Sequence, residues 1–185
     1  DTEDQTTTIE IKLRNSGSEV AFLKEVIFET NNHWEIITDK QHRLVEVSAE
    51  YNVDISKETN SKSKIKVHHE IKPQETERIH IILSTDYDSD PDGLSLFLMS
   101  IEFLYNEDSS KALSGPVLLN IRPKFQSAGS YFPCYSPGTI NKNKAVAREI
   151  INLESSGINI EEYIMNTANS WINAPSEEEY SDNKT

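Results

Sequence analysis

Hydrophobic and polar residues alternate along most of the chain between Thr6 and Ile121. A period of two is typical of β-strands, because successive side chains of a strand point to opposite faces of its sheet. The cleanest alternating run has six apolar positions: Val45, Val47, Ala49, Tyr51, Val53 and Ile55. The pattern predicts strands at roughly Thr6–Arg14, Val20–Thr30, His33–Ile37, Val45–Ile55, Ile65–Ile71, Ile79–Leu83, Leu94–Tyr105 and Val117–Ile121.

Two features disturb this alternation. Between Val20 and Thr30 the apolar residues change phase: in a regular strand, Leu23 would lie on the opposite face from Val26 and Phe28. Either both faces of this strand are covered or a bulge shifts the phase. Asn31 and Asn32 predict a turn, and residues 106–115 predict a long hairpin loop before the last strand.

The spacing of these runs predicts a mainly β fold, an antiparallel immunoglobulin-like sandwich of about eight strands over residues 1–123. No helical stretch interrupts the strands, so we do not expect a parallel βαβ sheet. The composition changes at Pro123. Residues 124–141 form an aromatic, Pro-, Gly- and Ser-rich linker, 142–174 a two-helix hairpin, and 175–185 an acidic disordered tail.

The predicted helical hairpin has an apolar stripe that needs a surface to cover it. A first helix is expected at Lys142–Ser155, ended by Gly157, and a second is expected after Asn159 as its N-cap, with Glu162 completing a capping box. The stripe docks on the sandwich, on another chain or on a neighbouring domain. The candidate partner-binding residues combine this stripe with two linker aromatics: Ile160, Ile164, Trp171, Ile172, Phe132 and Tyr135.

Composition limits the partners. The net charge is −13 and no basic run occurs, whereas proteins that bind nucleic acid need clustered Lys and Arg, so nucleic acid is disfavoured. No segment is apolar enough for membrane insertion. The single cysteine, Cys134, cannot form an internal disulfide; this leans toward a cytoplasmic location, with secretion or a surface location still open. Because the sequence starts at Asp1, we expect a fragment of a longer protein.

An acidic loop is the sharpest candidate for a metal site. Asp86, Asp88, Asp90 and Asp92 alternate before Gly93, and carboxylates spaced in this way can converge on a calcium ion. The twelfth position of an EF-hand counted from Asp88 would be Met99, where a Glu is required, so the loop is not an EF-hand. The alternative is a solvated acidic loop that keeps the hydrophobic strand after it soluble.

Other reactive residues give weaker signals. His68 and Glu70 share one face of a predicted strand, and His80 lies on the next strand, so a zinc site is one hypothesis and ordinary surface polarity the other. Cys134 has no neighbouring base and is interpreted as a small apolar residue. The chain has no phosphate-binding loop, no nucleophile elbow and no zinc-protease motif. We therefore predict that it is not an enzyme and needs no cofactor, calcium excepted.

The order of features resembles bacterial immunoglobulin-like domains of the cell-adhesion-related (CARDB) and fibronectin type III kind. The resemblance covers residues 6–123 and rests on the turn at residues 15–18, the segment 71–79 around Pro73, and the paired final strands. It implies a sandwich with a role in binding or spacing. The primary hypothesis is a non-catalytic protein-interaction or accessory domain whose partner is a protein or a neighbouring domain. The alternatives are a calcium-stabilised carbohydrate-binding or adhesin module and an acidic inhibitor or immunity-type protein.

Overall fold

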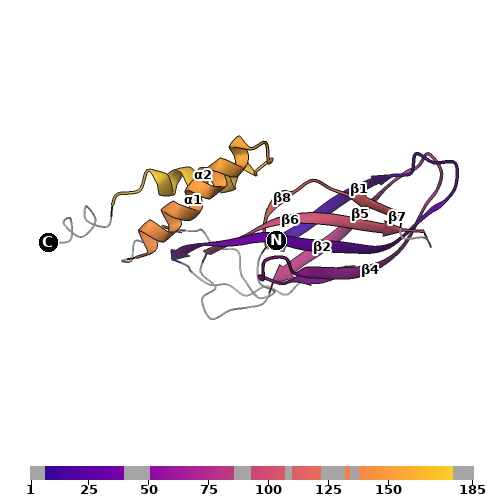
Figure 1. The fold of residues 1–185 in the computed structure, drawn as a ribbon, viewed down its shortest axis with the longest axis horizontal. Coiled ribbons are helices and arrows are strands. Elements are labelled where there is room, and N and C mark those ends of the chain that lie inside the picture. Colours follow the sequence, from indigo (N-terminus) through magenta and orange to yellow (C-terminus); the bar gives the residue numbers. More distant parts are fainter. Residues whose placement is uncertain are drawn as a thin grey trace, which may run out of the picture.

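The fold is mainly β, with two sheets that do not close into a barrel and two C-terminal helices (Figure 1). The computed structural model of the chain describes residues 7–39, 51–85, 93–106, 110–121, 132–133 and 138–176, and it describes the side chains of all of these except 38, 39, 132 and 133. The predicted mainly β fold with a two-helix C-terminal part is thus confirmed.

The strands divide between the two sheets. The first sheet has the order β1 (Thr7–Arg14), β5 (Thr76–Thr85) and β3 (Asn52–Ile55). The second has the order β4 (Lys62–Ile71), β2 (Ala21–Asp39) and β6 (Gly93–Tyr105), followed by β7 (Ser110–Leu113) and β8 (Val117–Asn120), which pair with successive parts of β6. The short β9 (Phe132–Pro133) pairs with the end of β2. All pairs are antiparallel except β3 with β5.

One hydrophobic core joins the two sheets. Val26 and Phe28 of β2 and Phe97 of β6 contribute from the second sheet, and Ile81 and Leu83 of β5 from the first. All five side chains are almost fully buried. The sequence forms this core because its apolar residues recur every second position, so each strand presents one apolar face inward.

Strand β2 is longer than the sequence predicts. The expected turn at Asn31 and Asn32 is wrong: the strand runs on to Asp39, and its register with β6 shifts between Thr30 and Asn32. A second shift lies between Leu23 and Glu25, so a bulge is the correct explanation for the phase change there. The expected loop at residues 106–115 is also wrong in part, because it contains β7.

Strand β6 buries different faces along its length, which explains its unbroken hydrophobicity. From Phe97 onward its odd-numbered residues face the core between the sheets. Leu94 and Leu96 point to the opposite face, where they form a second core with Ile36 of β2 and residues of both helices. The helices therefore cover the outer face of the second sheet near the start of β6.

The two helices form a hairpin. Helix α1 (Thr139–Ser155) begins three residues before the expected start. Beyond its C-cap Ser156 lies Gly157, at φ 90°, whose N–H donates to the carbonyl of Glu154. Helix α2 (Glu162–Ile172) has Glu161 as its N-cap, so the expected cap at Asn159 is wrong. Neither helix has the length and apolarity that a membrane crossing by a helix requires, and the same holds across the described part of the chain.

Candidate functional site

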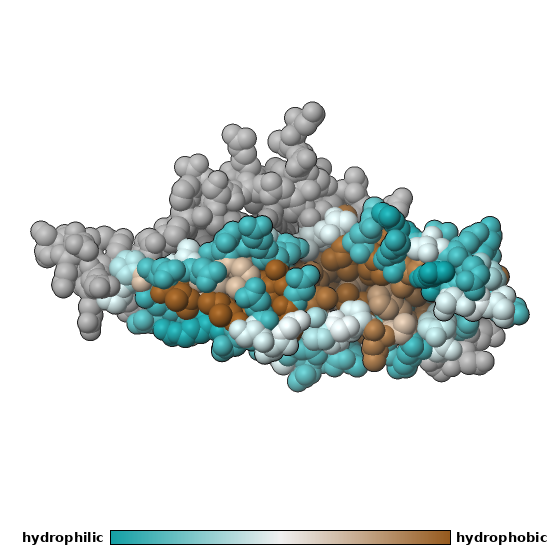
Figure 2. All heavy atoms as spheres, turned by 90° about the horizontal axis from the view of Figure 1, so that it is seen from above, coloured by the Kyte–Doolittle hydropathy of each residue, from teal (hydrophilic) through white to brown (hydrophobic). Residues whose placement is uncertain are grey.

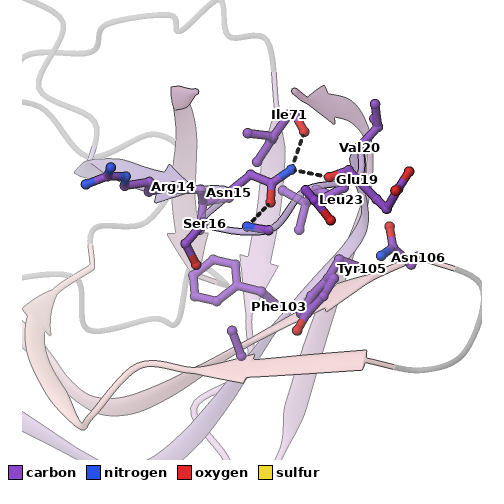
Figure 3. A pocket seen from close by; sticks show the side chains of 15 residues that line it. Arg14, Asn15, Ser16, Glu19, Val20, Leu23, Ile71, Phe103, Tyr105 and Asn106 are labelled. Atoms are coloured by element: carbon purple, nitrogen blue, oxygen red, sulfur yellow. Dashed lines mark hydrogen bonds between the residues drawn. The ribbon is translucent and has the colours of Figure 1, made fainter. Parts of the chain in front are cut away.

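A pocket of about 500 Å³ (Figure 3) opens at the end of the sandwich away from the helices (Figure 1). It lies between the β1–β2 turn, the end of β6 and strand β7. Its apolar lining consists of Leu13, Val20, Ala21, Leu23, Ile71, Phe103 and Ala112. The polar lining consists of Arg14, Asn15, Ser16, Ser18, Glu19, Tyr105 and Asn106, with Gly17 adding backbone only. The lining is thus mixed, and cavities that bind ligands combine apolar side chains with placed polar groups.

The side chain of Asn15 organises the turn that forms one wall of the pocket. Its amide N–H groups donate to the carbonyls of Glu19 (2.7 Å) and Ile71 (2.9 Å), and its oxygen accepts from the N–H of Gly17 at 3.0 Å (Figure 3). The adjacent β4–β5 turn adds Gln74, which donates to the carbonyls of residues 16 and 17. Two turns distant in sequence thus hold each other in place, so the wall exists before any ligand arrives.

Asn106 fixes the opposite wall. Its backbone lies in the left-handed region at φ 57°, a conformation that Asn adopts more readily than most residues. It exchanges two hydrogen bonds with Phe22: its side-chain oxygen accepts from the Phe22 N–H at 2.9 Å, and its own N–H donates to the Phe22 carbonyl at 2.8 Å. The start of β2 is thereby tied to the end of β6.

A second depression adjoins the first on the other side of β2. It is lined by Val20, Phe22, Leu23, Lys24, His68, His69, Glu70 and Asn106. The side chain of Phe22 is 50% exposed here, which is unusual for so large an apolar group. Val20, Leu23 and Asn106 border both depressions, so the two adjoin each other at this end of the molecule.

Most of the polar side chains that line the first pocket are uncharged. Ser16 and Ser18 are the only hydroxyl-bearing aliphatic residues in its lining, and the lining contains no His, Cys or Lys that could activate them. The charged groups at its rim are Arg14 and Glu19. Such a pocket suits an apolar side chain or ring flanked by polar groups.

The predicted helix residues are brought together, but inside the chain. Ile164 and Trp171 are buried, with exposures of 0% and 1%, in the core that the helices share with β2, β6 and β8. Ile160 and Ile172 pack against the same core and are partly buried. With the helices in this position, Ile164 and Trp171 cannot touch a second molecule. Of the three expected docking surfaces for the stripe, the sandwich is the one it uses.

Several other predicted site residues lie beyond what the structure describes. The candidate calcium ligands Asp86, Asp88, Asp90 and Asp92, and also Tyr135, fall outside the described residues. Phe132 forms part of β9, where its backbone pairs with Asp39 of β2. Within the described ranges, no three His, Cys, Asp or Glu side chains gather closely enough to hold a metal ion.

The histidine hypothesis is wrong, because the strands concerned belong to different sheets. His68 lies on β4 of the second sheet, and His80 lies on β5 of the first, where its Nε2 is 3.3 Å from the Glu10 carboxylate. His69 instead faces Glu77, with 3.6 Å between Nε2 and the carboxylate. The chain crosses around Pro73 from the second sheet to the first, so β4 and β5 do not pair with each other.

Sequence reasoning missed the pocket because its walls come from segments far apart in the chain. One signal was available: Phe22 occupies a position out of phase with the buried Leu23, so a large apolar residue was placed toward solvent. The turn at Asn15 was also visible as a turn, though not as a wall. No protein-family model, curated protein or solved structure matches this chain.

Proposed function

We propose that this chain is a non-catalytic protein-interaction module that binds its partner at the end of the sandwich formed by the β1–β2 turn and Asn106. The observation that carries the proposal is the preformed apolar pocket beside the exposed Phe22. Such a pocket accepts an apolar anchor from the partner, and exposed aromatic residues at its edge add contact area. The helices have a structural role in this account.

The physical argument rests on pre-organisation. The hydrogen bonds of Asn15 and of Asn106 hold both walls in the unbound chain, so binding orders few new groups. The lining lacks an activated nucleophile, which favours binding over chemistry. The net charge of −13 adds a preference for a partner with a basic surface.

We also propose that the sandwich is immunoglobulin-like. The supporting observation is the exchange of successive strands between the sheets: β1, β3 and β5 lie in one, and β2, β4 and β6 in the other. The central pairs β1–β5 and β2–β6 are antiparallel, as expected for that architecture. The parallel pairing of β3 with β5 departs from it.

The experiment fills the pocket. Ala112 lines it from β7 and is itself exposed, so Ala112→Trp places a ring over the cavity without disturbing the core. Leu113→Trp is the matched control, because the neighbouring residue lies on the other face of the same strand and is 73% exposed. Binding is measured by affinity purification of the tagged full chain from its native cells, with quantitative mass spectrometry of the retained proteins.

The account expects a partner that is retained by the unaltered chain and by Leu113→Trp, and reduced at least tenfold, or by about 1.4 kcal/mol, with Ala112→Trp. Equal retention by both variants would remove the pocket as the binding site. A small molecule that copurifies with the unaltered chain and is lost only with Ala112→Trp would instead show that the pocket binds a small ligand.

A further inference from the structure

The outer face of the first sheet carries a group of positive charges at the pocket end. Lys12 and Arg14 of β1 and Arg78 of β5 occupy positions that point away from the core, and all three side chains are exposed. Lys12 lies directly opposite Arg78 in the register of the two strands, and Arg14 follows two residues later, about 7 Å along the strand. We refer to these three residues as the cationic patch.

The cationic patch has little negative charge beside it. Glu10 is the one carboxylate among the outward-facing residues of β1, and it lies 3.2 Å from Arg78 and 3.3 Å from His80. Within the described part of the chain, neither Lys12 nor Arg14 forms an ion pair with a carboxylate. Like charges at paired positions destabilise a sheet, so placing Lys12 opposite Arg78 costs stability.

Protection of the sheet edge explains only part of this arrangement. Charged side chains on an edge strand keep other strands from pairing with it, which accounts for the charges of β1. It does not account for Arg78, because β5 lies between β1 and β3 and is not an edge strand. In a chain with 31 acidic and 18 basic residues, three cations beside one carboxylate reverse the charge locally.

The cationic patch adjoins the first pocket. Arg14 belongs to the lining of that pocket, together with its neighbour Leu13 on the other face of β1. Figure 3 shows the Arg14 side chain directed away from Phe103 and Tyr105, so its charge lies outside the apolar part of the cavity. A partner residue next to an apolar anchor in the pocket therefore lies close to a positive charge.

Apolar surface remains beside the cationic patch, between the edges of the two sheets. Ile9 and Ile11 of β1 and Val117 and Leu119 of β8 pack against the core but are only partly buried. Figure 2 looks down on the side where Figure 1 labels β1 and β8, and it shows a hydrophobic band bordered by hydrophilic side chains. A segment that leaves the pocket along this side meets apolar and positively charged groups together.

We propose that the partner binds through a segment in which acidic residues adjoin an apolar anchor. The anchor enters the first pocket, and the carboxylates pair with the cationic patch. This inference rests on the proposed function, whose pocket it uses. Arg14 and Arg78 can each hold a carboxylate through two parallel N–H···O bonds, a geometry that fixes the direction of the bound segment.

The net charge of the chain is compatible with this local preference. A charge of −13 acts on an approaching partner as a whole, whereas at contact the charges within about 8 Å dominate at physiological ionic strength. A partner with a basic surface and an acidic segment at the contact satisfies both preferences.

Peptide selection tests the charge preference. Short random peptides displayed on phage are panned against the tagged full chain, and the binding of the selected peptides is then measured by fluorescence polarisation. We expect selected sequences with an apolar residue next to two or more Asp or Glu residues, and binding that weakens as salt is added. Arg14→Glu should weaken binding at least about tenfold. Arg148→Glu, the same change at an exposed position of α1, is the matched control and should alter binding less than about twofold.

The outcomes separate this inference from the proposed function, with circular dichroism to verify that each variant is folded. Loss of peptide binding with Ala112→Trp but not with Arg14→Glu would overturn the role of the cationic patch and leave the pocket as the binding site. Equal binding by Ala112→Trp and the unaltered chain would contradict the pocket, and with it both proposals. Selected sequences rich in Lys or Arg, or the absence of any selected sequence, would overturn the acidic segment.

Discussion

Asn143 of α1 and Ile37 of β2 form two hydrogen bonds with each other, like a pair of residues in neighbouring strands. The Asn143 amide donates to the Ile37 carbonyl at 2.8 Å, and its oxygen accepts from the Ile37 N–H at 3.2 Å. Asn143 is fully buried. A helix side chain thus satisfies the backbone of a strand end and fixes the helices to the sheet.

Asn143→Ala should lower the free energy of unfolding by about 1–3 kcal/mol, because two partly buried backbone groups of Ile37 lose their partner. Urea denaturation followed by circular dichroism measures the loss. The control is Asn152→Ala, an exposed residue of the same helix, with an expected change of about 0.5 kcal/mol or less. Equal losses would show that the hydrogen bonds to Ile37 add nothing specific.

Gly93 lies against the backbone of β2 at the start of β6. A Cβ atom at this position would lie 1.9 Å from the carbonyl oxygen of Ile36. Gly93→Ala must therefore push the two strands apart, at a cost of about 1–3 kcal/mol or more. Gly115→Ala is the control, since a Cβ there meets nothing within 4 Å. Thermal melting of the two variants side by side provides the comparison, and similar melting temperatures would refute the close approach.

Trp171 lies at the centre of the core shared by helices and sheet. Trp171→Ala should cost about 3–5 kcal/mol, because it leaves a large cavity among Ile36, Leu94 and their neighbours. Strand β6 contributes to both cores, so we expect one cooperative transition, shifted as a whole. Two transitions, with the sandwich unaffected, would show that the helices fold as an independent unit.

An ion pair on the outer face of the second sheet should make the stability of the fold depend on pH. Glu102 lies 2.5 Å from the ammonium of Lys111. The pKa of Glu102 is lowered from its ordinary value of 4.5, chiefly by the hydrogen bond from Lys111. Desolvation opposes this shift, and the positive charges of Lys111, Lys62 and Lys64 add to it. A lowered pKa in the folded state stabilises the fold above pH 4.5, and this stabilisation is lost as the pH falls through the lowered value.

The test compares wild type with Glu102→Gln from pH 7 to pH 3. Wild type should be more stable at neutral pH, and the difference should shrink below pH 4.5. Lys111→Met should weaken the same pH dependence, since it removes the main cause of the shift. A stability difference that stays constant down to pH 3 would contradict this assignment.

The local pattern of the sequence predicted most strands but not how they meet. The alternation at Ile9, Ile11 and Leu13 and around Val67 identified strands correctly, because period-two burial is a local property. The continuation of β2 past Asn31 was missed because a bulge and a turn use similar residues. The pocket and the sheet assignment of His80 depend on contacts between distant segments, which no local pattern encodes.

The helices illustrate the same limit. Their apolar stripe was evident, and its need for a covering surface followed from physics. The surface that covers the stripe is formed in part by Leu94 and Leu96 of β6. The sequence does not reveal that these two residues point away from the core between the sheets, because they belong to an unbroken hydrophobic run. We therefore propose that the partner binds at the opposite end of the molecule and not at Ile164 and Trp171.

Photo-crosslinking from single positions in living cells is the most direct test of that account. A benzophenone amino acid replaces Phe22 at the pocket end or Tyr163 on α2, two aromatic residues that are 50% and 41% exposed. The account predicts a covalent adduct with another protein from position 22 and none from position 163. Adducts from position 163 with none from position 22 would contradict it and return the binding surface to the helices.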